Sequence, residues 1–366
     1  MVTRVCAAVF ACMLTLTLAS GVAAAQDDVQ PPPAPPEPVP MRDEPPSESP
    51  REAQLNALAK ARNFNDSQKR DVGAIWKMLD DAAGGKRTVN ELPLSWVGQD
   101  AVKEGALVFV PFTVMLDTAR TAGGDVWLSW RAVPKSAPSG AQPRPKNQPV
   151  IEDISIVPSR QASGGRIARA LVAPPGEYDL YIVVRDVTPS RRGAPSPKAS
   201  VLKQSVTVPN FGTELTTSSV FVPATIARLP APLAPRDRIE RPYAIGTIEV
   251  VPVAARTFDK DGNLSAFFQI YNQRSGTDRK PNVTVDYTFY TRQPGGETLF
   301  NKTAPQILNA TTLPPEFDPA RHLLQTSMMV PLTSFPPGDY RLEIAITDLV
   351  AAKTITREVL FTVTGG

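Results

Sequence analysis

The sequence predicts an all-β protein in which two tandem antiparallel β-sandwiches, of immunoglobulin or fibronectin type, follow a short helical hairpin and a proline-rich linker. Two observations predict this class. A turn-and-strand motif runs from Pro174 to Asp186 and again from Pro336 to Asp348, so that the copies are offset by 162 residues (336 minus 174). Short apolar segments with frequent turn signals, and no long helical stretch between them, surround both copies.

Each copy of the motif indicates a turn followed by a strand. The Pro-Pro-Gly start cannot continue a ladder, and Tyr, Leu and Ile then recur at every second position, which is the period of a half-buried strand. A further apolar strand follows each copy, at 201–208 and at 355–363. We expect Tyr178 and Tyr340 to be equivalent core residues whose hydroxyls bond to nearby backbone, as in a tyrosine corner.

The composition limits the partners that this chain can have. The 366 residues include 39 prolines and 22 glycines, which disfavour long helices and favour turns, edge strands and stiff linkers. The formal net charge is only +3, and no aromatic platform is interleaved with the basic residues. The sequence therefore gives no indication of a nucleic-acid partner.

The N-terminus has the pattern of a secretory signal peptide over residues 1–25. Arg4 precedes an apolar stretch, and three alanines before Gln26 fit a cleavage site. An uncleaved membrane anchor is the alternative. Both cysteines, Cys6 and Cys12, lie in this segment, so cleavage leaves a mature chain without disulfides, thiolate metal sites or a cysteine nucleophile. No other apolar run is long enough to span a bilayer, and we expect a periplasmic or secreted protein.

The remaining organisation follows from composition and periodicity. Residues 26–50 form a proline-rich linker, which we expect to be an extended spacer or else a ligand for a proline-recognising groove. A helical hairpin is predicted over 51–85, with Val72, Ile75, Trp76 and Leu79 on one stripe of its second helix. The first β-sandwich is placed at 92–229, a linker at 230–242 and the second β-sandwich at 243–366.

Side chains that could support catalysis or hold a metal are few. The single histidine, His322, lies in a proline-bounded segment, and no serine occupies a Gly-x-Ser-x-Gly elbow. We therefore predict that the protein is not an enzyme and that it binds no cofactor. The oxygen-bearing residues Asp259, Asp261 and Asn263 surround Gly262 and could suit calcium. The turn lacks the bidentate glutamate of an EF-hand and more simply suits a hairpin turn between two strands.

One strand suggests where a partner would bind. In the segment 126–132, Val126, Leu128 and Trp130 share the face expected to meet the core, which leaves Trp127 and Arg131 on the opposite face. Tryptophan and arginine are enriched at interaction hot spots, so this pair is the candidate partner-binding site. The alternative is that the helical hairpin covers Trp127, because the stripe that includes Trp76 needs an apolar surface.

Parts of the second half resemble a known family. The Pro-Gly-x-Tyr-x-Leu strands that end in Asp, the segments Val206-Thr207-Val208-Pro209 and Leu215-Thr216-Thr217-Ser218-Ser219, and Phe268-Gln269-Ile270-Tyr271-Asn272 carry the resemblance. It is to the C-terminal region of secreted bacterial proteins related to von Willebrand factor type A, and it implies export and a β-sandwich tail. The nearest match to the Asp-x-Ser-x-Ser metal site of the type A domain, Asp153-Ile154-Ser155-Ile156-Val157, lacks the last serine, so metal-dependent adhesion is not implied.

The function expected from these observations is an exported, non-catalytic binding or scaffolding protein of the bacterial cell envelope. An envelope protein or glycan is the expected partner, and the sequence does not identify the ligand. The proline-rich spacer makes a structural role in surface assembly the first alternative. A hydrolase with an unrecognised carboxylate site is the second.

Overall fold

Antiparallel pairing dominates the sheets, as the alternating segments of the sequence predicted; the pairing of β13 (Thr257–Asp259) with β20 (Lys353–Thr364) is parallel. The computed structural model describes residues 49–135, 151–162, 164–188, 193 and 196–365. The predicted signal peptide and nearly all of the predicted proline-rich linker lie outside the described residues. Two large apolar clusters each fill the space between two sheets, which confirms the predicted all-β sandwich class.

The first sandwich packs two sheets around Val110, Phe112, Leu128, Trp130 and Ile182. One sheet has the order β5-β4-β7-β8, and in the other β3 lies between β6 on one side and β1 with β2 on the other. The strands are β1 (Leu94–Gln99), β2 (Val102–Glu104), β3 (Leu107–Leu116), β4 (Val126–Pro134), β5 (Ile151–Val157), β6 (Arg166–Ala173), β7 (Gly176–Asp186) and β8 (Ala199–Val208).

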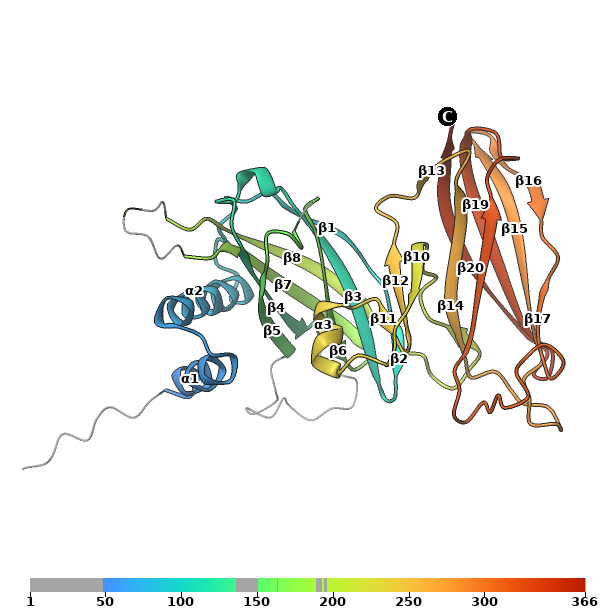
Figure 1. The fold of residues 1–366 in the computed structure, drawn as a ribbon, viewed down its shortest axis with the longest axis horizontal. Coiled ribbons are helices and arrows are strands. Elements are labelled where there is room, and N and C mark those ends of the chain that lie inside the picture. Colours follow the sequence, from blue (N-terminus) through green and yellow to red (C-terminus); the bar gives the residue numbers. More distant parts are fainter. Residues whose placement is uncertain (1–48, 136–150, 163, 189–192, 194–195, 366) are drawn as a thin grey trace, which may run out of the picture. The chain divides into compact units, whose positions relative to one another are not determined.

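A helical hairpin covers the outer face of the β5-β4-β7-β8 sheet (Figure 1). It consists of α1 (Pro50–Arg62) and α2 (Asp66–Ala83), close to the predicted bounds. The capping box of α2 joins the Asn65 side chain to the Gln68 N–H at 2.9 Å and the Gln68 side chain to the Asn65 N–H at 3.0 Å. The predicted stripe of α2 faces the sheet, and Val72, Ile75 and Leu79 are completely buried.

A smaller sheet and a short helix accompany the other sheet of the first sandwich. The order β10-β12-β11 joins β10 (Pro223–Arg228), β11 (Ala244–Ile245) and β12 (Ile248–Pro252), and α3 (Pro235–Glu240) precedes β11 and contacts β6. Phe221, Ile245, Val250 and Phe267 form an apolar cluster here. The predicted linker at 230–242 thus contains a helix, because Pro235 is favourable in a first helical turn.

The second sandwich pairs a sheet of order β13-β20-β19-β15-β16, with β17 also on β15, with a sheet of order β18-β14-β9. Its strands are β9 (Thr216–Thr217), β13 (Thr257–Asp259), β14 (Asn263–Tyr271), β15 (Val283–Gln293), β16 (Gly296–Lys302), β17 (Gln306–Leu308), β18 (Leu324–Pro331), β19 (Gly338–Asp348) and β20 (Lys353–Thr364). Strand β9 lies within the range predicted for the first sandwich. It pairs with β14 because Leu215 and Val222 beside it join the second core.

Tyr271, at the end of β14, joins the two sandwiches. Its ring belongs to the apolar cluster of the first sandwich and packs edge-on against Phe211, with ring centroids 5.1 Å apart. Its hydroxyl donates to Gln269 Oε1 at 2.7 Å and accepts the backbone N–H of Lys103 at 3.2 Å. Burial raises the pKa of this phenol to about 12, so it remains a neutral donor at physiological pH.

The two copies of the repeat are the strands β7 and β19, and their bounds keep the 162-residue offset. The hydroxyl of Tyr178 donates to Pro174 O at 2.9 Å, and that of Tyr340 donates to Pro336 O at 2.7 Å, which confirms the predicted tyrosine bonds. Each strand ends in a buried aspartate whose carboxylate accepts backbone N–H groups of nearby loops, as Asp348 does from Arg274 at 2.7 Å.

The outer faces of the two copies differ, and this difference determines where the hairpin packs. In β7 the residues Tyr181 and Val183 are buried in the apolar cluster that includes α2. The positions 162 residues later hold Glu343 and Ala345, which are half-buried, and Glu343 accepts a bond from Arg341 at 2.8 Å. Only the first copy therefore offers an apolar outer face that a helix can cover.

The tyrosine corner of the second sandwich can be tested by substitution. Tyr340 is 1% exposed and contacts Phe300, Phe335 and Phe361. We expect Tyr340→Ala to lower the free energy of unfolding by about 3–5 kcal/mol, as for other large-to-small core changes. Tyr340→Phe, which removes only the bond to Pro336, should cost about 1 kcal/mol. Urea unfolding measures both, and a loss below about 0.5 kcal/mol for the alanine variant would contradict this packing.

Candidate functional site

The predicted partner-binding pair, Trp127 and Arg131, lies beneath the helical hairpin. Trp127 is 0% exposed and Arg131 is 8% exposed. The interpretation of this pair as an exposed binding surface is therefore corrected, because α2 packs on this face of β4. The alternative derived from the sequence, in which the hairpin covers Trp127, describes the structure.

Trp127 anchors the hairpin to the sheet by packing and by one hydrogen bond. Its indole shares a cluster with Val72 and Ile75, and Phe64 meets it edge-on with ring centroids 5.3 Å apart. The indole Nε1–H donates to Asp71 Oδ2 at 3.1 Å. The polar atom of this buried side chain is thereby satisfied, as burial requires.

Asp71 is a buried carboxylate with several donors around it. It accepts the backbone N–H of Thr188 at 3.0 Å, the hydroxyl of Thr188 and a guanidinium N–H of Arg185, in addition to the Trp127 indole. Burial raises the pKa of Asp71, but these hydrogen bonds outweigh the effect of burial. The pKa of Asp71 therefore lies below its ordinary value.

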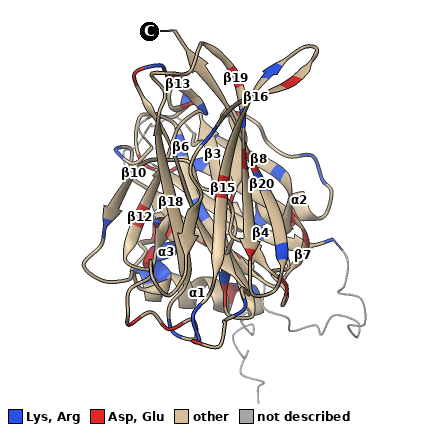
Figure 2. Ribbon diagram, turned by 90° about the vertical axis from the view of Figure 1, so that its right-hand side faces the viewer, with Lys and Arg blue, Asp and Glu red and all other residues tan. Residues whose placement is uncertain are grey.

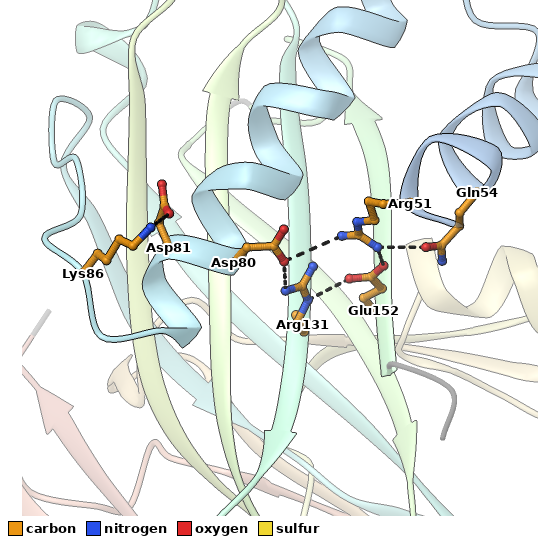
Figure 3. A network of polar contacts seen from close by, with 7 residues as sticks. All are labelled: Arg51, Gln54, Asp80, Asp81, Lys86, Arg131 and Glu152. Atoms are coloured by element: carbon orange, nitrogen blue, oxygen red, sulfur yellow. Dashed lines mark hydrogen bonds and ion pairs between the residues drawn. The ribbon is translucent and has the colours of Figure 1, made fainter. Parts of the chain in front are cut away.

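A second polar network holds the other end of the hairpin (Figure 3). Arg131 donates to Asp80 Oδ1 on α2 at 2.5 Å and to Glu152 Oε2 on β5 at 2.8 Å. Arg51 on α1 donates to the other oxygen of Glu152 at 3.0 Å, and its guanidinium lies 3.8 Å from the centroid of the Trp76 ring. Both helices and two strands are thus connected by charge-assisted bonds, which makes this region a docking interface.

A groove elsewhere in the described residues offers an accessible site. It encloses about 960 Å³ and is lined by β2, α3 and its flanking residues, β11 with the following turn, the start of β18 and the loop that precedes β18. Its lining is more apolar than polar and includes Leu233, Ile245, Leu313, Phe317 and Leu323. The volume falls in the usual range for sites that bind small molecules or short segments of chain.

Two basic side chains are fixed at this groove. Arg238 on α3 donates to Glu104 at 2.9 Å, and its guanidinium lies 4.3 Å from the centroid of the Phe109 ring. Its Nε–H is buried and has no hydrogen-bond partner among the described residues. Lys103 donates to the side chain of Asn272 at 2.9 Å. Elsewhere, basic and acidic residues are interspersed over the ribbon (Figure 2).

His322 also lines the groove, in the loop before β18. Its Nδ1 accepts the backbone N–H of Asp318 at 2.9 Å, so the imidazole orders this loop. The ring lies beside Phe317, with centroids 5.8 Å apart. The histidine thus has a structural role in this loop.

The turn considered for calcium, at Asp259, Asp261 and Asn263, connects β13 and β14. These strands belong to different sheets, so the predicted hairpin is not formed: β13 pairs with β20, and β14 pairs with β18. The Asp259 carboxylate accepts the hydroxyl of Thr364 at 3.0 Å. Among the described residues, no group of three or more His, Cys, Asp or Glu side chains is placed to hold a metal ion. No helix in the described part of the chain is long and apolar enough to cross a membrane.

The groove could not be predicted from the sequence. Its walls come from segments more than 200 residues apart, as Lys103 and Gln325 illustrate. The free edge of β18 and the orientation of α3 are properties of the assembled sheets. The one local signal in the sequence is the proline-bounded segment around His322.

Comparisons with known proteins identify no family. No family model matches the chain, and no curated protein matches it. Similar solved structures include an immunoglobulin-like protein from Pseudomonas aeruginosa, with 13% identity over 40% of this chain and 97% of that one and a TM-score of 0.20. They also include a Salmonella alpha-2-macroglobulin mutant (13% identity, 74% of this chain, TM-score 0.21) and dimeric latent PorU from Porphyromonas gingivalis (12%, 78%, TM-score 0.27). This chain spans only 16% and 21% of those two structures. Similarities at this level assign no function.

The docking of the hairpin should depend on pH through Asp71. A carboxylate whose pKa is lowered on folding stabilises the fold above its unfolded value of about 4, and this contribution is lost as the pH falls through the lower folded value. We therefore expect the protection factors of the α2 amides, which correct for the slower intrinsic exchange in acid, to fall as the pH is lowered. Asp71→Asn should remove this pH dependence and cost about 3 kcal/mol at neutral pH, because Arg185 loses its buried partner.

The matched control for this experiment is Asp66→Asn, an exposed aspartate in the first turn of the same helix. It should leave both the stability at neutral pH and the acid dependence close to those of the unchanged protein. An Asp71→Asn variant that retains the full acid dependence would show that another group controls hairpin release.

Proposed function

We propose that this protein is an exported, non-catalytic binding or scaffolding protein of the bacterial cell envelope, and that the groove between β2, α3 and β18 is its ligand site. The predicted signal peptide supports the exported location. The groove supports the binding role, because it combines an apolar lining with fixed polar groups. That combination is typical of recognition sites.

The groove is the observation on which the proposal depends. The ion pair between Arg238 and Glu104 and the bond between Lys103 and Asn272 hold its polar groups in place before a ligand arrives. Because a preformed site loses less conformational entropy on binding, this rigidity favours affinity. By contrast, the first predicted site at Trp127 is filled by the hairpin and has no room for a ligand.

Binding can be measured by immobilising the full chain and offering peptidoglycan fragments, soluble envelope glycans and envelope proteins separately. We expect at least one class to bind saturably. Leu323→Asp places a charge at an apolar position of the groove that is 56% exposed, and it should weaken that binding about tenfold.

Leu299→Asp is the matched control, since Leu299 is 63% exposed and lies on β16 outside the groove. It should leave binding unchanged. Binding that is equally strong in the Leu323→Asp variant would place the ligand elsewhere, and the absence of saturable binding for all three classes would contradict the proposed function.

Export is tested separately. We expect the mature chain to begin at or near Gln26, because the apolar stretch and the alanine triplet precede it. Mass spectrometry of protein recovered from the producing cell reads the N-terminus directly. An intact Met1 in the cytoplasmic fraction would contradict the exported location.

A further inference from the structure

We propose that the groove recognises an extended peptide segment of a partner protein, which pairs with the free edge of β18 and carries apolar side chains and one acidic group. This inference rests on the proposed function, since it specifies the ligand of the same groove. Three observations support it: the direction of the peptide groups on β18, the apolar lining, and the excess of basic over acidic residues in the groove.

Strand β18 has a free edge, and its residue Gln325 lines the groove. In its sheet β18 is the outer strand, and no other strand of the described residues pairs with its far side. Gln325 lies opposite Gln269. The N–H of Gln269 donates to the Ser218 hydroxyl and its C=O accepts the Ser218 N–H, so Gln269 directs both peptide groups away from β18.

The peptide groups of Gln325 must then face the free edge. In an antiparallel pair, two opposite residues either exchange both backbone bonds or direct both outward. Ser327 confirms the orientation, because its C=O accepts a bond from the side chain of Gln306 and not from β14. Residues two apart on a strand direct their peptide groups alike, so Gln325 has a donor and an acceptor on the free edge of β18. Gln325 is also one of the residues that line the groove.

An added strand is the ligand that satisfies these groups together. Main-chain bonds to a free edge supply affinity, and pockets for alternate side chains supply specificity. The apolar residues Leu233, Ile245 and Leu313 line the same groove and suit such side chains. A saturated acyl chain would fit the apolar lining but would leave the donor and acceptor of Gln325 unused.

The charges favour an acidic group on the peptide. Arg238, Lys103 and Arg321 line the groove with only two acidic residues, Glu104 and Glu316, and Glu104 is paired with Arg238. A carboxylate on the peptide would complement this excess of positive charge.

The test is a selection of random twelve-residue peptides displayed on phage against the immobilised full chain, followed by titration of the enriched synthetic peptides. We expect enriched sequences to alternate apolar residues and to contain Asp or Glu. Replacing alternate backbone N–H groups of the peptide by N-methyl groups should weaken binding at least about tenfold, because edge pairing is lost. Sodium laurate serves as the acyl-chain probe.

The matched variants are Gln325→Pro and Met329→Pro. Both residues direct their N–H away from β14 by the two-residue periodicity, so proline removes no ladder bond at either position. Gln325 lines the groove, whereas Met329 does not. Gln325→Pro should weaken peptide binding about tenfold and Met329→Pro should not, with the melting temperatures of both variants confirming that the fold is retained.

The outcomes separate this inference from the proposed function. Peptides that bind equally well after N-methylation, or that are unaffected by Gln325→Pro, would overturn the edge pairing and leave the groove as a binding site. Binding of laurate or glycans without any peptide would overturn the peptide class alone. If no probe binds and the three envelope classes also fail to bind, both this inference and the proposed function are contradicted.

Discussion

The first sandwich depends on the burial of both faces of one of its sheets. Seven consecutive residues of β4, from Val126 to Ala132, are buried, so this strand has no face in contact with water. Its inner face meets the core, and its outer face carries Trp127, Ser129 and Arg131, which only a further layer can cover. The helical hairpin provides that layer, and it needs the sheet equally, because two short helices cannot bury their own apolar stripe.

Polar side chains at this interface determine how the hairpin sits. An apolar stripe alone would allow a helix to slide or rotate on the sheet. The hydrogen bonds of Asp71 with Trp127, Arg185 and Thr188 can all form in only one position of α2, so they fix its placement. The Arg131 network fixes the other end of α2 through Asp80. Each buried charge has its partners, so the interface avoids the high cost of an isolated charge in an apolar site.

Local features of this protein could be predicted from the sequence, and long-range ones could not. The repeat predicted β7, β19 and their tyrosine bonds, because turn residues and alternation are encoded within a dozen positions. Alternation also predicted that Trp127 and Arg131 leave the core face, but it could not show what covers that face. The groove, the helix in the predicted linker and the assignment of β9 to the second sandwich depend on which distant segments meet, and composition carries no signal for that.

The placement of β9 and Tyr271 affects how the protein unfolds. The chain enters the second sandwich at β9, returns to the small sheet at β10 and only then completes the second sandwich, while the ring of Tyr271 remains in the first core. Opening either core therefore exposes apolar surface of the other. The two sandwiches should melt in a single cooperative transition. Cleavage of the chain between them should yield two fragments that each lack some residues of their own apolar core.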